Sequence, residues 1–125
     1  MARKLLLIAL AGSAGTLARY WLGGAVQRLF GADFPFGTWA VNILGCLLFG
    51  LVWVLSEERF AISGEARVVI VTGFMGAFTT FSTYIFESSG MAGDGQWLAL
   101  AANLAGQNVL GFAAFYAGVL MGRVV

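Results

Sequence analysis

The residues with the most evident chemistry lie together, in the segment Thr-Thr-Phe-Ser-Thr-Tyr at positions 79–84. Five of these six side chains carry a hydroxyl group, although the surrounding stretch has no charged residue. A single serine or threonine in an apolar helix can bond back to its own carbonyls, but five are hard to explain in that way. Dense O–H donors can replace part of the water shell of a small anion, and this is the chemistry that the segment indicates.

The same region predicts a break in its helix. Gly73 and Gly76 precede two β-branched threonines, and this combination weakens a helix. A break inside a membrane frees backbone carbonyls, which are tolerated only within protein or beside a cavity and which favour a cation. Phe81 and Tyr84 are three positions apart and share a helix face. Their electropositive ring edges can face an anion, and the alternative is that they only pack or contact lipid.

Two further polar side chains lie in apolar surroundings, where such groups are costly. Arg19 has three interpretations: an interfacial anchor, a cap for carbonyls of a neighbouring helix, or a charge that attracts anions to a pore mouth. Asn42 follows a helix start that Pro35 favours and that Thr38 is expected to cap. Its amide needs a partner, which is either an interhelical hydrogen bond or an anion.

The last apolar segment carries a stripe of polar and small residues at helical spacing. Its members are Asn103, Gln107, Gly111 and Gly118. Such a stripe suits a pore wall or a tight helix interface, and both interpretations stay open. Glu87 is expected at the end of the preceding helix, near the membrane interface, so that no carboxylate lies deep in any span.

Composition excludes most other classes of protein. The chain has 125 residues, of which 60% are hydrophobic and 10% are charged, whereas a soluble domain carries about 25% charged residues. The net charge of +1 gives no basic surface for nucleic acid. There is no histidine, and Cys46 is the one cysteine, which excludes His/Cys metal clusters, Ser-His-Asp triads and an intrachain disulfide. No Walker sequence is present, and we do not expect an enzyme.

The predicted fold is all-α: one domain over residues 1–125 with four transmembrane helices at about 4–29, 35–56, 67–87 and 95–122. The first run resembles a signal peptide, but it continues too far and three more runs follow. The termini and the second loop carry five of the six interfacial Lys/Arg residues, which favours termini in the cytoplasm. Four short helices enclose little interior, so we expect an oligomer, with glycines at close helix contacts.

At these positions the chain resembles the CrcB/Fluc family of fluoride channels. The match covers almost the whole chain, with matching stretches at residues 12–20, 37–45 and 73–84. The most specific element is the last stretch, Gly-Phe-x-Gly-x-Phe-Thr-Thr-Phe-Ser-Thr-Tyr. The family usually has a second phenylalanine where this chain has Tyr84, which keeps the ring edge and adds a hydroxyl.

The resemblance implies a dual-topology homodimer with two fluoride pores along the subunit interface. The five-to-one Lys/Arg count keeps a heterodimer with an oppositely oriented paralogue as an alternative. A structural sodium ion is implied at the dimer centre, held by the backbone carbonyls of Gly76 and Thr79. The hydroxyl cluster and the resemblance together predict these pore residues: Arg19, Asn42, Thr80, Phe81, Ser82, Thr83, Tyr84, Asn103 and Gln107.

We therefore expect a passive channel in the plasma membrane, in contact with lipid, that lets cytoplasmic fluoride leave the cell. The first alternative is a small proton-coupled four-helix multidrug exporter. That class would want a carboxylate deep in the first helix, where this chain has only Arg19 as a charge. The second alternative, a non-transporting subunit of a membrane assembly, does not explain the hydroxyl cluster.

Overall fold

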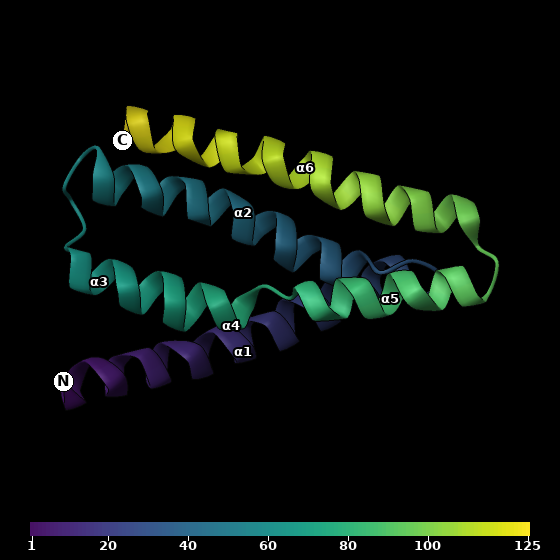
Figure 1. Cartoon of the computed structure of the whole chain (residues 1–125), viewed down its shortest axis with the longest axis horizontal. Coiled ribbons are helices and arrows are strands. Elements are labelled where there is room, and N and C mark those ends of the chain that lie inside the picture. The colour runs from purple at the N-terminus through teal and green to yellow at the C-terminus, as the bar shows by residue number, and fades with distance from the viewer.

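The computed structural model describes all 125 residues, and its regular structure is entirely helical (Figure 1). Four segments are long and apolar enough to cross a membrane. Three are unbroken helices: α1 (Ala2–Phe30), α2 (Phe36–Glu57) and α6 (Trp97–Val124). The other is divided into four pieces: α3 (Gly64–Val68), the π-helix η1 (Val69–Met75), α4 (Gly76–Phe78) and α5 (Phe81–Gly93).

This third segment extends beyond the expected range of 67–87 at both ends. It begins earlier because Ser63 is an N-cap, whose Oγ accepts a hydrogen bond from the Ala66 N–H at 3.2 Å. It ends later because no residue stops α5 before Gly95, which adopts a left-handed conformation with φ +68°. Glu87 is therefore not at the end of its helix, as the sequence predicted, but within α5.

The connection between α1 and α2 is held by a side chain that the sequence did not single out. The Nε2 of Gln27 donates to the carbonyl of Phe34 at 2.8 Å, and its Oε1 accepts from the N–H of Gly37 at 2.9 Å. The prediction that Thr38 caps α2 is wrong, because Pro35 occupies the N-cap and no side chain caps from within the helix. Gln27 supplies the missing acceptor from α1. The Thr38 hydroxyl instead donates to Glu87.

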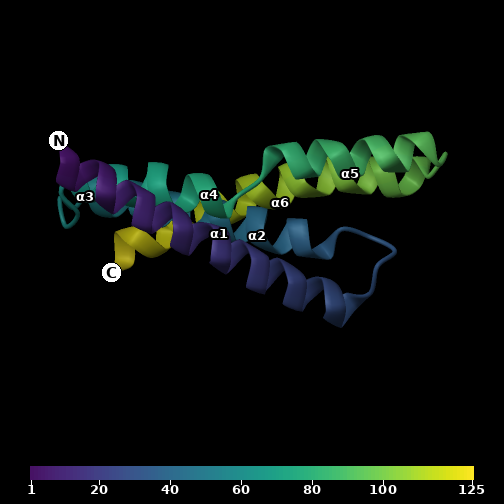
Figure 2. The same cartoon turned by 90° about the horizontal axis from the view of Figure 1, so that it is seen from below.

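Close helix contacts depend on glycine, as predicted. α6 runs beside α2 (Figure 1), and a Cβ atom on Gly118 would collide with the backbone carbonyl of Leu47. On the other side of the molecule α1 crosses η1 and α4, where a Cβ on Gly15 would collide with the carbonyl of Phe74. Figure 2 shows that α1 then diverges from α5 toward the end opposite the termini. These contacts fix α6 on α2 and α1 on the middle of the third segment.

Both termini and the α2–α3 connection lie at one end of the molecule (Figure 1). Arg123 donates to both carboxylate oxygens of Glu58 there, at 3.0 and 2.8 Å, and Arg67 pairs with Glu57. The hydrogen bonds from Arg123 lower the pKa of Glu58 below its usual range. This surface pair is therefore formed at neutral pH and is lost as the pH falls through the lowered pKa.

The interior of one chain is thin. Only 23 of the 125 residues are buried, and large apolar side chains such as Leu6, Phe86 and Leu98 are exposed. An apolar surface of this extent is not stable in water. Lipid or another subunit must therefore cover most of the molecule.

The α2–α6 contact predicts the effect of a single methyl group. Gly118→Ala places a Cβ against the Leu47 carbonyl, which belongs to a helix backbone and cannot rotate away. We expect a loss of about 1–3 kcal/mol in stability, measured by thermal unfolding in detergent. The control is Gly90→Ala in α5, which has no atom within 4 Å of its added Cβ. Equal unfolding midpoints for the two variants would contradict this contact.

Candidate functional site

The third membrane segment is broken near its middle. Thr79 and Thr80 are both extended, with φ −82°, ψ 160° and φ −150°, ψ 106°, and they separate α4 from α5. The break that Gly73, Gly76 and the two threonines predicted is confirmed, and it falls on the β-branched pair itself. The π-helix η1, which α4 separates from the break, was not predicted.

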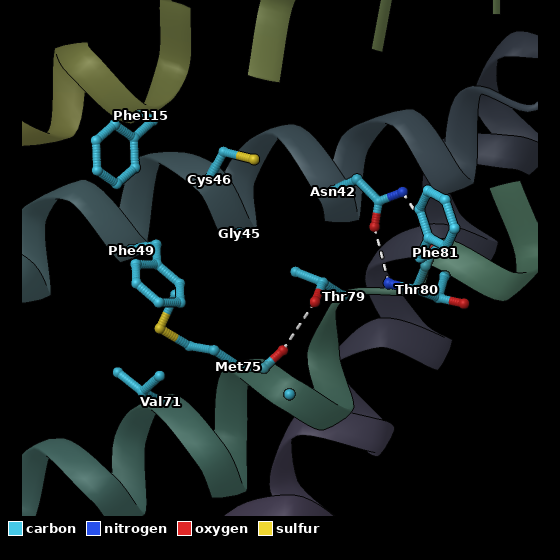
Figure 3. A pocket seen from close by; sticks show the side chains of 11 residues that line it. Asn42, Gly45, Cys46, Phe49, Val71, Met75, Thr79, Thr80, Phe81 and Phe115 are labelled. Atoms are coloured by element: carbon cyan, nitrogen blue, oxygen red, sulfur yellow. Dashed lines mark hydrogen bonds between the residues drawn. The ribbon is translucent and has the colours of Figure 1, made fainter. Parts of the chain in front are cut away.

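The side chain of Asn42 satisfies the backbone of Thr80 at the break (Figure 3). Its Oδ1 accepts the Thr80 N–H at 2.8 Å, and its Nδ2 donates to the Thr80 carbonyl at 3.2 Å. In a continuous helix the Thr80 N–H would donate to the carbonyl of Gly76. The amide therefore replaces helical partners in the way that a neighbouring strand would, and the Gly76 carbonyl loses its own partner.

A second carbonyl at the break is approached by Arg19. The Nη1 of this residue donates to the Thr79 carbonyl at 3.4 Å. Of the three interpretations of Arg19, the structure thus supports the one in which this side chain caps a carbonyl of a neighbouring helix. The guanidinium also places a positive charge beside the break, where its field attracts anions.

The break creates a helix N-terminus inside the segment. Thr80 is the N-cap of α5, and its Oγ1 accepts from the Thr83 N–H at 3.2 Å. The N–H groups of Phe81 and Ser82 have no acceptor within the chain. The N-terminal end of a helix carries partial positive charge and unsatisfied donors, so this end of α5 favours an anion.

The five hydroxyls of residues 79–84 fall into two groups. Three donate within the chain: Thr79 to the Met75 carbonyl at 3.0 Å, Thr80 to Thr83 Oγ1 at 2.8 Å, and Tyr84 to the Leu104 carbonyl at 3.4 Å. The hydroxyls of Ser82 and Thr83 donate to no protein group, and both residues are exposed. With Phe81, which is 74% exposed, they form what we call the α5 donor patch.

A cavity of about 330 Å³ lies beside the break (Figure 3). Five of the predicted site residues line it: Asn42, Gly76, Thr79, Thr80 and Phe81. The remaining wall is mainly apolar, from Gly45, Cys46, Phe49, Val71, Met75 and Phe115. The structure therefore brings together the residues of the break from α2, α4 and α5 around one space.

Asn103 and Gln107 lie behind Asn42 rather than in this cavity. The Nδ2 of Asn42 donates to Gln107 Oε1 at 2.9 Å, and the Nε2 of Gln107 donates to Asn103 Oδ1 at 2.9 Å. Both α6 residues are buried, as are Gly111 and Gly118 on the same stripe. Within one chain the stripe is thus a tight helix interface.

The rings of Phe81 and Tyr84 are neighbours, as their spacing predicted, with centroids 5.6 Å apart and planes inclined at 49°. Their environments differ, because Tyr84 is only 7% exposed. Its hydroxyl is held on α6, where it donates to Leu104 and accepts from Asn108 Nδ2 at 3.2 Å. The extra hydroxyl of Tyr84 therefore holds the ring against α6, where it is buried beside the exposed Phe81 of the α5 donor patch.

Sequence reasoning missed two polar residues of this region, Trp39 and Ser88, and it missed the contact between two others, Thr38 and Glu87. Trp39 and Ser88 both contact Asn103, and the spacing of Trp39 to Asn42 on one helix face was a signal that could have found the first. The Thr38 hydroxyl donates to Glu87 Oε1 at 2.6 Å, whereas Glu87 Oε2 is buried without a partner. Glu87 lines a separate cavity of about 600 Å³ at the end opposite the termini.

Comparison with known proteins gives a consistent result. Residues 6–119 match the family described as "CrcB-like protein, Camphor Resistance (CrcB)". A protein of Solidesulfovibrio magneticus named fluoride-specific ion channel FluC is 62% identical over 125 residues, which is all of both chains. A protein of the same name from Nitrosococcus oceani is 54% identical over 100% of both chains. Another, from Maridesulfovibrio salexigens, is 52% identical over 98% of this chain and 97% of the relative.

Proposed function

The chain belongs to the CrcB family, and from this premise we propose that it is a fluoride channel, which lets the ion cross the plasma membrane passively. It is a multi-pass membrane protein with four spanning helices and a transporter, not an enzyme. The observation that carries the proposal is the helix N-terminus that the break creates in the middle of a membrane segment, beside the α5 donor patch.

Fluoride is small and holds its water tightly, so a pore must offer many donors without binding the ion too firmly to release it. The α5 donor patch has this character. It offers the free N–H groups of Phe81 and Ser82 and the O–H groups of Ser82 and Thr83, which donate to no protein group, together with the electropositive edge of the Phe81 ring. These groups form a series of weak sites and not one strong site. Such a series favours conduction, because no single site holds the ion too firmly to release it.

A second subunit completes the path. Free donors and exposed carbonyls at mid-membrane are not satisfied by lipid, so another protein surface must face the α5 donor patch. A copy of this chain in the opposite orientation would do so with two-fold symmetry, giving a dual-topology homodimer with two equivalent paths. The alternative is an oppositely oriented paralogue. Fluoride flux from vesicles that contain only this purified chain would exclude a need for the paralogue.

We also propose a structural sodium ion at the dimer centre, held by the carbonyls of Gly76 and Thr79. The break supports this, because both carbonyls lose their helical partners and Gly76 is exposed. Arg19 already donates to the Thr79 oxygen, but a carbonyl oxygen has a second lone pair. When bound, the ion would supply positive charge and tie the two subunits together.

Phe81→Ile tests the fluoride path. The substitution keeps apolar bulk but removes the ring edge, and Phe81 is exposed, so the fold of the chain should not change. We expect fluoride efflux from liposomes, recorded with a fluoride electrode, to fall to the level of protein-free vesicles. The matched control is Phe86→Ile on the same helix, where the side chain is 78% exposed and efflux should stay normal.

The same assay separates the alternatives. A channel gives fast, fluoride-selective efflux that does not depend on a proton gradient. A proton-coupled exporter, for which Glu87 would be the candidate carboxylate, gives transport that follows the imposed pH gradient. Efflux of Phe81→Ile equal to that of the unchanged chain would remove this ring from the path.

Removal of sodium tests the ion. Protein purified and reconstituted with N-methyl-D-glucamine in place of sodium should lose fluoride efflux, and the dimer should dissociate more readily on size-exclusion chromatography. Restoring sodium should restore both properties. Unchanged efflux and unchanged dimer stability in sodium-free buffer would contradict the sodium proposal and leave the fluoride channel standing.

A further inference from the structure

We propose that Trp39 and Ser88 are positioning residues for the helix break, because together they fix the direction in which three buried side-chain amides point. The amides belong to Asn103, Gln107 and Asn42, and they form one hydrogen-bonded relay from α2 and α5 through α6 back to Thr80. The inference rests on the proposed function, since it concerns the same break, but it adds two residues that do not touch the cavity beside it.

The relay begins at the indole of Trp39, which can donate a hydrogen bond but cannot accept one in its place. An indole N–H only donates, and Trp39 Nε1 lies 2.7 Å from Asn103 Oδ1. The amide oxygen of Asn103 must therefore face Trp39. Asn103 is fully buried, with 0% of its surface exposed, so an amide that turned its NH₂ toward the indole would leave two donors facing each other without water.

Ser88 fixes the same amide from the opposite side. Its hydroxyl donates to the Tyr84 carbonyl at 2.7 Å, and this uses its one hydrogen. Its Oγ is then left as an acceptor, and Asn103 Nδ2 donates to it at 2.9 Å. The orientation of Asn103 is thus determined twice, by Trp39 from α2 and by Ser88 from α5.

The orientation of the Asn103 amide determines the orientations of the Gln107 and Asn42 amides, and therefore which atom of Asn42 faces the break. Asn103 Oδ1 also accepts from Gln107 Nε2, so the oxygen of Gln107 faces Asn42 and accepts from its Nδ2, both at 2.9 Å. Asn42 consequently turns its own oxygen toward the Thr80 N–H, which like the indole only donates. All the links agree in direction, and a reversal at Asn103 would place the NH₂ groups of Gln107 and Asn42 against each other.

The consequence concerns the role of Asn42. Its Nδ2 donates to both Gln107 Oε1 and the Thr80 carbonyl, so its two amide hydrogens are used within the chain. Asn42 holds Thr80 extended, and this sets where α5 begins and where the α5 donor patch lies. We call the two hydrogen bonds between Asn42 and Thr80 the Asn42 clasp. Trp39 and Ser88 act on the ion path through this clasp and not by contact with the ion.

The test is a double-mutant cycle with Trp39→Phe and Ser88→Ala. Each single variant leaves one group to orient Asn103, whereas the double variant leaves neither. We expect the double variant to lose more fluoride efflux in liposomes than the two single losses combined would give. The control is Trp53→Phe, also on α2, because this ring is 47% exposed and its N–H has no partner within the chain.

A spectroscopic measurement separates positioning from general instability. The chain has only six threonines, so ¹⁵N-threonine labelling gives few backbone signals in detergent, and the Thr80 N–H reports directly on the Asn42 clasp. We expect hydrogen exchange at Thr80 to be roughly tenfold faster in the double variant, which corresponds to about 1.4 kcal/mol. The other threonine signals should change little. If the double variant does not fold, the Trp39→Phe single variant should show the same shift in smaller measure.

The outcomes are distinguishable from failure of the proposed function. Suppose that the wild-type chain conducts fluoride. Additive effects of the two substitutions on efflux, together with unchanged Thr80 exchange in the double variant, would then overturn the positioning role and leave the channel intact. Absence of fluoride efflux from the wild-type chain would instead refute the channel, while Thr80 exchange would still report whether the relay orients Asn42.

Discussion

Two hydrogen bonds between the Asn42 amide and the backbone of Thr80 are the interaction on which the rest of the site depends. A membrane helix that breaks leaves N–H and C=O groups that lipid cannot satisfy, at a cost of several kcal/mol for each group. The Asn42 side chain satisfies both groups of Thr80 at once. The break can therefore exist inside an otherwise apolar segment, and α5 can begin where it does.

The packing of the helices serves to bring Asn42 to that position. α2 approaches the break closely one turn after Asn42, where a Cβ on Gly45 would collide with the Thr79 methyl group. Glycines also hold α2 on α6, which carries the two buried amides that support Asn42 from behind. Arg19 approaches the break from α1. Side chains of α1 and α2 thus meet at two extended residues, and α6 supports Asn42 from behind. This explains why so few polar groups are needed in so apolar a chain.

The sequence predicted what depends on local chemistry. The four spans follow from apolar length, and the break follows from glycines before β-branched threonines. What it could not predict depends on the register between distant helices. Trp39 and Asn103 are 64 positions apart, and no local pattern shows that an indole N–H will meet that amide. The same holds for Thr38, which bonds to Glu87 because Gln27 has replaced it at the start of α2. Spacing showed that Phe81 and Tyr84 are neighbours, but α6 decides that only Tyr84 is buried.

The most direct test of the central claim is fluoride efflux from liposomes that contain Asn42→Asp protein. The carboxylate has nearly the same shape as the amide, but it cannot donate to Thr80 or Gln107, and it brings a negative charge to the start of α5. We expect this variant to elute as the wild-type assembly does in detergent and to release no fluoride. Efflux at the wild-type rate would mean that neither the clasp nor the charge of this position matters to the ion, and the account would be wrong.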